Sequence, residues 1–290
     1  SSVVKGLVKL GAVSEEDSPR DLPYPRLDPD YGSKELTEDQ LVGAKVLREA
    51  VASGKYGTTL LKGVTGSGKT EVYLEAVAEC LRKGRQALVL LPEIALTAEF
   101  LTRVEARFGM KPTEWHSGVT MTERRRCWRM VGQGEAQLIV GARSALFLPY
   151  RDLGLIVVDE EHDTSYKQED GVLYNARDMT VLRASLNAAQ VVLASATPSL
   201  ESWANVEAGK YARVTLASRY GVAVMPKMSA IDMRIEDLPG SRWISPTLQK
   251  MVESRLKKGE QSLLFLNRRG YAPVTICRAC GHQIGWNDCD

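Results

Sequence analysis

The segment Gly63–Thr70, with the sequence GVTGSGKT, places three glycines around one lysine between an apolar run and a stretch of helical periodicity. This spacing fits the phosphate-loop pattern G-x-x-x-x-G-K-[ST] in its required strand-to-helix context. Glycines let backbone N–H groups turn inward around an anion, and the N-terminus of the following helix adds donors and partial positive charge. We therefore expect the loop to cradle a nucleotide phosphate; the alternative is a glycine-rich turn that matches by chance. The residues expected at the phosphate are Gly63, Val64, Thr65, Gly66, Ser67, Gly68, Lys69 and Thr70.

Within this loop two side chains have distinct expected roles. Lys69 would reach the β- and γ-phosphates, and the Thr70 hydroxyl would hold Mg²⁺. Gln40, in the segment LTEDQ upstream of the loop, is a candidate for binding adenine through its amide. The alternative for Gln40 is an ordinary solvated glutamine.

A run of four chemically active residues, DEEH, follows the apolar stretch LGLIVV and begins at Asp159. A carboxylate at a strand end beside a phosphate loop can hold the shell of Mg²⁺, and the next one can orient the attacking water. We assign Asp159 to the metal and Glu160 to the water. His162 is expected to relay the state of the nucleotide to Ser195–Thr197, the polar stretch after another apolar run. A charged loop that merely follows a strand is the alternative.

These residues need elements that bring them together. Short apolar runs alternate with helical stretches, and strands that are apolar on both faces and separated by helices favour an α/β fold with a parallel sheet covered by helices on each side. Ligands of such sheets bind at the carboxyl ends of the strands, where every unusual segment falls. The expected strands span residues 58–64, 87–92, 136–142, 153–160 and 190–196.

The domain organisation is expected to have five parts. Residues 1–13 carry a short helical stripe, and residues 14–35 are rich in proline and acids, without periodicity, and are expected to be a linker. The main domain then spans 36–216, with Thr37 as the cap of its first helix. A second, incomplete unit is expected over 217–273, with a helix at 245–259 and a strand from 261, followed by a cysteine-rich end at 274–290.

Composition is that of an ordinary globular protein: 290 residues, 44% hydrophobic and 26% charged, with a formal net charge of +2. Bulk charge therefore gives no sign of a nucleic-acid partner, so any such surface must be a local patch. No apolar run is long enough to span a bilayer, and the first residues lack the order of a signal peptide. We expect a cytoplasmic location.

The cysteines fall into two groups. Cys80 and Cys127 stand alone in helix-like stretches and are expected to be buried, inert thiols. Cys277 and Cys280 form a C-x-x-C-G knuckle that is typical of zinc ribbons, and Cys289 follows. One knuckle supplies only half of a tetrahedral site.

The ordered set GVTGSGKT, LLPEIALT, GARSALF, DEEHD and SATPS resembles the first motor domain of superfamily 2 helicases of the DEAH type. More narrowly, LLPEIALT, GARSALF, YKQEDGVLYNARD, ATPSLES and NRRGYAP are similar to the forms of the PriA (primosomal protein N′) family of replication restart helicases. The likeness runs from residue 36 to residue 290.

This resemblance implies a RecA-like P-loop motor domain, the start of a second motor domain and a partial zinc ribbon, with residues 1–13 as the end of a winged-helix domain. It implies an ATP-dependent DNA helicase that moves 3′ to 5′ on single-stranded DNA, restarts stalled replication forks and loads the primosome. The implied cofactors are ATP, Mg²⁺ and, in the intact protein, Zn²⁺. The implied partners are single-stranded and forked DNA, primosome and replication restart proteins, and single-stranded DNA-binding protein, with no membrane.

The resemblance also implies a DNA surface. Gly141, Arg143 and Ser144 would contact the DNA backbone, together with the loop at 94–97. The segment 166–174 resembles an aromatic-rich loop that couples DNA to the ATP site. Its side chains suit that role, because tyrosines can stack on bases and cations can contact phosphate. The residues concerned are Tyr166, Lys167, Tyr174 and Arg177, and an ordinary surface loop is the alternative.

Two departures from the family pattern lower the expected activity of this chain alone. Trp286 stands where a second cysteine pair would begin, so we expect no ordered zinc or only a partial site. The part that would carry the arginine finger of the second motor domain is not in this sequence, so we expect weak ATP binding and poor hydrolysis. A non-translocating nucleotide switch, or a platform that recruits restart partners at forks, are the competing hypotheses.

Overall fold

A computed structural model describes residues 2–14, 22–92, 98–217, 227–236, 244–265, 275–276 and 283–284. The chain divides into two units, residues 1–223 and 224–290. The first unit contains the functional segments identified above and is described in most detail.

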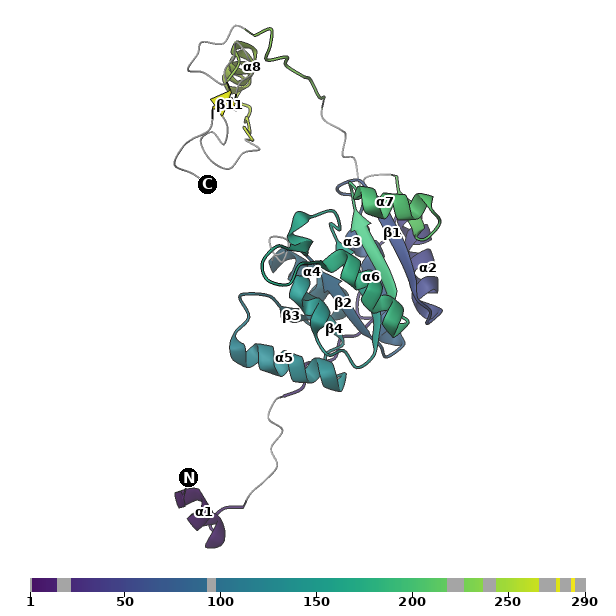
Figure 1. The fold of residues 1–290 in the computed structure, drawn as a ribbon, viewed down its shortest axis with the longest axis vertical. Coiled ribbons are helices and arrows are strands. Elements are labelled where there is room, and N and C mark those ends of the chain that lie inside the picture. Colours follow the sequence, from purple (N-terminus) through teal and green to yellow (C-terminus); the bar gives the residue numbers. More distant parts are fainter. Residues whose placement is uncertain are drawn as a thin grey trace. The chain divides into compact units, whose positions relative to one another are not determined.

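A parallel sheet of seven strands forms the centre of the first unit (Figure 1). Its strand order is β3-β4-β2-β5-β8-β1-β9. The inner strands β2, β5 and β8 are buried along nearly their whole length, which explains their continuous apolar sequences. The strands are β1 Gly57–Gly63, β2 Gln86–Leu90, β3 Thr113–Trp115, β4 Leu138–Gly141, β5 Leu153–Asp159, β8 Gln190–Ser195 and β9 Ala212–Leu216.

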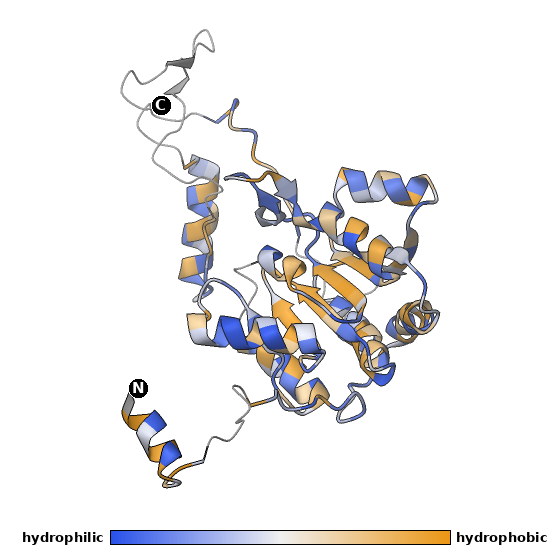
Figure 2. Ribbon diagram, turned by 60° about the horizontal axis from the view of Figure 1, so that its bottom comes forward, coloured by the Kyte–Doolittle hydropathy of each residue, from blue (hydrophilic) through white to orange (hydrophobic). Residues whose placement is uncertain are grey.

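Helices cover both faces of the sheet, because successive strand side chains point to opposite sides and create two apolar layers. Val89 of β2 belongs to the layer under α2, α3 and α4, whereas Leu88 and Leu90 belong to the layer under α5 and α6. The hydrophobic strands and the mixed colouring of the helices show this arrangement in Figure 2. The helices are α2 Glu38–Ala52, α3 Lys69–Arg82, α4 Ala98–Phe108, α5 Met121–Gln133, α6 Ala176–Asn187 and α7 Leu200–Glu207.

Two short features complete the surface at the carboxyl ends of the strands. A 3₁₀ helix, η2, spans Arg143–Phe147, and another, η3, spans Thr164–Tyr166. The two-residue strands β6 (Lys167–Gln168) and β7 (Tyr174–Asn175) pair antiparallel as a small hairpin. Asn175 caps α6 by accepting a hydrogen bond from the backbone N–H of Arg177.

The α/β fold and all five expected strands are present. The sequence analysis missed the two edge strands, β3 and β9. β3 has only three residues, and β9 is mostly exposed, so neither carries the apolar run by which the inner strands were recognised.

Part of the expected linker is packed on the first unit instead. Leu27 is buried, and its backbone N–H donates to Gln137 Oε1 at 2.9 Å. The N–H of Asp28 donates to the carbonyl of Phe108 at 3.0 Å. Prolines keep this segment out of helices and strands, which hid its attachment from a search for periodicity.

The remaining described elements are one helix of the first unit and three elements of the second unit. Helix α1 spans Ser2–Lys9, and the second unit contains α8, Pro246–Lys257, capped by Ser245. Residues 261–265 form no strand, and the rest of the strand expected there lies outside the described residues. A two-residue ladder joins β10 (Thr275–Ile276) to β11 (Gln283–Ile284). Among the described residues no helix has the length and apolar character needed to cross a membrane.

Candidate nucleotide-binding site

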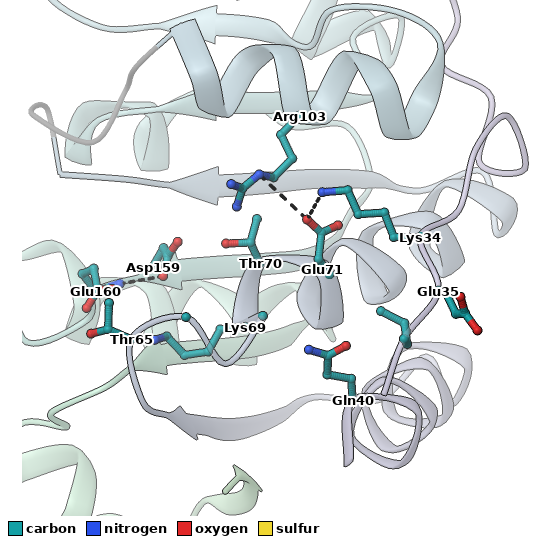
Figure 3. A pocket seen from close by; sticks show the side chains of 13 residues that line it. Lys34, Glu35, Gln40, Thr65, Lys69, Thr70, Glu71, Arg103, Asp159 and Glu160 are labelled. Carbon is teal, nitrogen blue, oxygen red and sulfur yellow. Dashed lines mark hydrogen bonds and ion pairs between the residues drawn. The ribbon is translucent and has the colours of Figure 1, made fainter. Parts of the chain in front are cut away.

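The glycine loop curls tightly between the end of β1 and the start of α3 (Figure 3). Gly66 and Gly68 have φ angles of +79° and +80°, which glycine adopts without the steric cost of a side chain. A Cβ on Gly68 would also lie 2.3 Å from Nε2 of Gln40. The local sequence therefore fixes the shape of this loop through backbone freedom and close packing.

The loop holds polar groups that are suited to an anion. Lys69 is buried, and its ammonium donates to the carbonyl of Gly63 at 3.0 Å. The hydroxyl of Ser67 is buried without a hydrogen-bond partner among the described residues. An unpartnered buried hydroxyl is costly, and a bound phosphate oxygen would satisfy it. These residues therefore fit a nucleotide phosphate.

The predicted acidic residues share a cavity with this loop. Asp159 ends β5, and Asp159 and Glu160 line a cavity of about 520 Å³ together with Thr65, Lys69 and Thr70. The two segments are far apart in the sequence and meet because parallel strands present their carboxyl ends at one edge of the sheet. The geometry is that of a phosphate loop facing two carboxylates.

Tyr73 of α3 is a site residue that the sequence analysis missed. Its buried hydroxyl donates to Asp159 Oδ2 at 2.9 Å, and the backbone N–H of Glu160 donates to Oδ1 at 3.0 Å. Burial raises the pKa of Asp159, and these two hydrogen bonds oppose the rise. Burial also raises the pKa of Glu160, and the charge of the adjacent Asp159 adds to it. Two neighbouring carboxyl groups with raised pKa values suit a site that is completed by a cation such as Mg²⁺.

His162 and Ser195 are brought together as expected. His162 Nδ1 lies 2.8 Å from Ser195 Oγ, and that hydroxyl also accepts from the backbone N–H of Thr197. Glu160, between Asp159 and this contact, has a φ angle of +45°, which is unusual for a residue with a side chain. Glu160 therefore lies in the turn between Asp159, which lines the cavity, and His162, which contacts the end of β8.

Glu161 forms a buried network that the sequence did not reveal. Its carboxylate accepts from the N–H and hydroxyl of Ser199 and from the hydroxyl of Ser202. Arg177 reaches the same carboxylate at 3.4 Å, and the side chain of Glu161 is fully buried. The network joins the acidic turn to the start of α7.

Gln40 lines the cavity but is not a solvated glutamine, so that alternative is wrong. It is buried; its Oε1 accepts from the N–H of Thr37, and its Nε2 donates to the carbonyl of Ser67. Its amide therefore links the start of α2 to the glycine loop. Binding of adenine by Gln40 stays a prediction.

Two further cations stand beside the cavity (Figure 3). Lys34 Nζ lies 2.7 Å from Glu71 Oε1, and Arg103 Nε lies 3.8 Å from the same oxygen. Lys34 comes from the segment that was expected to be a linker. The sequence carried no motif for either residue.

The residues expected to contact DNA divide into a set whose side chains are at least partly exposed and a set whose side chains are buried. Arg143 donates to the carbonyls of Ser165 and Lys167, and the exposed Ser144 accepts from Trp115 Nε1. Tyr174 is half-buried and packs edge-to-face on Phe147, with a ring separation of 5.2 Å. The side chains that remain on the surface are those of Ser144 and Lys167, with Arg143 and Tyr174 partly exposed.

Two of the expected DNA contacts are corrected by burial. Tyr166 is 1% exposed, and its hydroxyl donates to the carbonyls of Leu90 and Asp159, so its ring offers no face to a base. Arg177 is 7% exposed and is occupied by Glu161 and other partners, so it is not available to a phosphate. Both were misassigned because the assignment rested on resemblance to an aromatic-rich loop and on residue type, and neither of these indicates burial.

Packing constrains Gly141, whose contact with DNA stays a prediction. A Cβ on Gly141 would lie 2.4 Å from the carbonyl oxygen of Trp115, so the strand pair β3–β4 requires glycine at this position. The loop at 94–97, Cys277, Cys280, Trp286 and Cys289 lie outside the described residues.

The two isolated thiols are buried, as expected. Burial raises the pKa of both Cys80 and Cys127 to about 12. Such a pKa favours the protonated thiol at neutral pH, and the inertness of both cysteines stays a prediction.

Comparison with known proteins decides the family. A family model described as DEAD/DEAH box helicase matches residues 43–206. The chain belongs to this family. Its members use ATP, typically with Mg²⁺, which agrees with the cavity described above.

Curated relatives confirm the narrower resemblance to the PriA family. The chain is 47% identical over 255 residues to the replication restart protein PriA of Rickettsia felis, covering 88% of this chain and 39% of that protein. It is 41% identical over 293 residues to the PriA of Bacillus subtilis, covering 100% of this chain and 36% of that protein. The chain thus spans little more than a third of the length of these relatives.

A solved structure supports the fold. A structure of RecG bound to a three-way DNA junction matches with a TM-score of 0.51 at 19% identity, covering 79% of this chain and 29% of that one. At this identity the match shows the fold alone, and it agrees with the expected parallel α/β fold of the first unit.

Proposed function

We propose that the chain is the ATP-binding motor part of a DNA helicase that restarts stalled replication forks, moving 3′ to 5′ on single-stranded DNA and loading the primosome. The observation that carries the proposal is the shared cavity, in which Lys69 faces Asp159 and Glu160. Similarity to PriA proteins over 88–100% of the chain supports the restart role.

The residues of the cavity divide the work of ATP hydrolysis between them. Lys69 exchanges the carbonyl of Gly63 for the β- and γ-phosphates, and the unpartnered Ser67 hydroxyl donates to a phosphate oxygen. Thr70 and Asp159 would hold Mg²⁺, which would supply positive charge beside the phosphates. Glu160 orients the attacking water, because it follows the metal-binding carboxylate at the rim of the cavity.

Movement on DNA requires the site to communicate with the surface. Tyr166 donates to the backbone carbonyl of Asp159, and the next residue, Lys167, accepts from Arg143 through its own carbonyl. The hairpin that carries Lys167 and Tyr174 is therefore tied directly to the metal-binding residue. We assign Arg143, Ser144, Lys167 and Tyr174 to the DNA strand on this basis.

The finer parts of the proposal follow from the resemblance. They are a cytoplasmic location, binding of forked DNA, restart proteins and single-stranded DNA-binding protein, and a zinc ribbon around Cys277, Cys280 and Cys289 in the intact protein. Poor hydrolysis by the 290-residue chain alone also stays a prediction.

The test compares Lys69→Ala with Lys83→Ala in the protein as the cell makes it. Lys83 is an exposed lysine at the end of α3, away from the cavity, and serves as a matched control. Lys69→Ala should lower DNA-stimulated ATP hydrolysis about 10²-fold or more, as expected when a positioned donor to the transition state is lost. The control should hydrolyse ATP like the parent.

Two outcomes would overturn the proposal. Hydrolysis by the parent that does not respond to single-stranded DNA would favour a nucleotide switch. Restart activity that survives Lys69→Ala would favour a platform that only recruits partners.

A further inference from the structure

Helix α5 presents an unusual face to solvent. Its sequence, MTERRRCWRMVGQ, contains four arginines and one glutamate. Cys127, Met130 and Val131 face the core, whereas Met121, Arg125, Trp128 and Arg129 are exposed and Arg124 is partly exposed. These outward residues recur at helical spacing, so they form one stripe along the helix. A solvent face normally mixes charges of both signs, but this stripe has no acid.

The stripe borders an open cavity of about 400 Å³ that contains two indole rings. It is lined by Trp115, Met121, Arg124, Arg125, Trp128 and Arg129. The guanidinium of Arg124 lies 5.7 Å from the ring centre of Trp115, and Trp128 is 50% exposed. The single glutamate of α5, Glu123, is occupied by Tyr24 and Arg126. No carboxylate therefore neutralises the cavity among its lining residues.

The cavity is continuous with the surface assigned to DNA. Trp115 ends β3, and its indole N–H donates to the hydroxyl of Ser144 on η2 at 3.1 Å. Helix α5 lies on the outside of the first unit, beside β3 and β4 (Figure 1). A strand that reaches Ser144 would meet the cavity next.

We propose that the α5 patch, defined as Trp115, Arg125 and Trp128, binds single-stranded nucleic acid as an extension of the motor's track. This inference rests on the proposed function. The exposed indole of Trp128 offers a flat surface on which an unpaired base stacks, and the exposed guanidinium group of Arg125 matches a phosphate. Bases of a duplex are already stacked on each other, so a duplex would leave the indole unused.

Nucleic acid fits this surface better than a protein partner does. The apolar part of the cavity consists of two indole rings and Met121, and its charged lining residues are all arginines. A protein that binds such a positively charged surface must itself be acidic. Every nucleotide of a single strand carries both a phosphate and a base, so a single strand supplies negative charge and a ring for stacking together. Charge complementarity therefore selects the occupant.

The test measures binding of a fluorescent oligothymidylate by anisotropy over a range of salt concentrations, using the protein as the cell makes it. Trp128→Ala should weaken binding about five-fold or more, the effect of losing one stacked base. Trp128→Phe keeps an aromatic face and should restore most of the affinity. Arg125→Ala should reduce the slope of log K against log salt by about 0.7, because one phosphate contact is lost.

Lys83→Ala is the matched control for charge, because it removes one exposed cation that does not line the cavity. It should leave both affinity and salt slope unchanged. If Trp128→Ala and Arg125→Ala behave like Lys83→Ala while the parent binds DNA, the patch proposal is wrong and the proposed function stands. If the parent binds no single-stranded DNA, the proposed function fails and the patch proposal fails with it.

Self-association is the remaining alternative for this surface. Sedimentation of the parent and of Trp128→Ala distinguishes it, because the variant would dissociate a dimer without changing its affinity for the oligonucleotide. That result would also overturn the proposal. Because Trp128 is half exposed, all variants should unfold at the temperature of the parent within a few degrees.

Discussion

Removing one oxygen atom from Tyr73 should destabilise the first unit in a pH-dependent way. Tyr73 is fully buried, and its hydroxyl donates to Asp159 Oδ2 at 2.9 Å. A hydrogen bond to a charged group contributes about 1.5–3 kcal/mol. Tyr73→Phe should therefore lower the free energy of unfolding by about that amount at pH 8, where Asp159 is ionised.

The sign of the pH dependence follows from the pKa of Asp159. Burial already raises that pKa above its unfolded value, and loss of the Tyr73 hydrogen bond raises it further. Between the unfolded and folded values the native state binds more protons, so its stability falls as pH rises through this window. The pH range between the unfolded and folded pKa values of Asp159 is wider in Tyr73→Phe than in the parent. The cost of the substitution should thus be smaller at pH 5, where the orphaned carboxyl group takes up a proton, than at pH 8.

Tyr150→Phe is the matched control. Tyr150 is also buried, but its hydroxyl donates to the neutral backbone carbonyl of Ala145 at 3.1 Å. Its loss should cost about 0.5–1.5 kcal/mol, equally at both pH values. Urea unfolding followed by circular dichroism measures all three proteins. An equal cost of Tyr73→Phe at pH 5 and pH 8 would refute the assignment of Asp159 as an ionised partner.

Two further substitutions test the packing around the site, both by urea unfolding. Arg177→Met should lower the free energy of unfolding by about 3–5 kcal/mol, because it leaves the carboxylate of Glu161 buried without its cation. Adding Glu161→Gln should recover part of this loss. A loss below about 1 kcal/mol for Arg177→Met alone would contradict the argument. Gly141→Ala should cost about 1–3 kcal/mol, since its Cβ would lie 2.4 Å from Trp115 O. Gly132→Ala, whose nearest contact is 3.6 Å, should be neutral or stabilising; equal effects of the two would refute the steric argument.

The parts of the site that could be predicted from sequence are those that use local patterns. The glycine loop is eight consecutive residues, and Gly66 and Gly68 are required there by their positive φ angles. The acidic turn could be placed at the same edge because parallel strands end together. The strands were predicted from continuous apolar runs, and the inner strands β2, β4, β5 and β8 are indeed buried along nearly their whole length.

The parts that could not be predicted depend on contacts between distant segments. Tyr73 sits in α3 among apolar neighbours, so its sequence context describes a core residue and gives no sign of the hydrogen bond to Asp159. Lys34 lies in a proline-rich stretch without periodicity, and only the folded chain shows that it reaches Glu71. Glu161 directly follows Asp159 and Glu160, which line the cavity, yet its own side chain is buried and accepts hydrogen bonds from Ser199 and Ser202.

Burial of Tyr166 changes the account of how DNA binding could influence the ATP site. If Tyr166 were exposed, it would stack on a DNA base, and further contacts would be needed to connect it to the ATP site. In the structure its hydroxyl already bridges the carbonyls of Leu90 and Asp159, at 3.0 Å and 2.6 Å, so it holds together the ends of β2 and β5. The adjacent Lys167 is exposed and begins the hairpin. Displacement of that hairpin by a bound strand would therefore act on the backbone of Asp159, the residue proposed to hold Mg²⁺, through the side chain of Tyr166 alone.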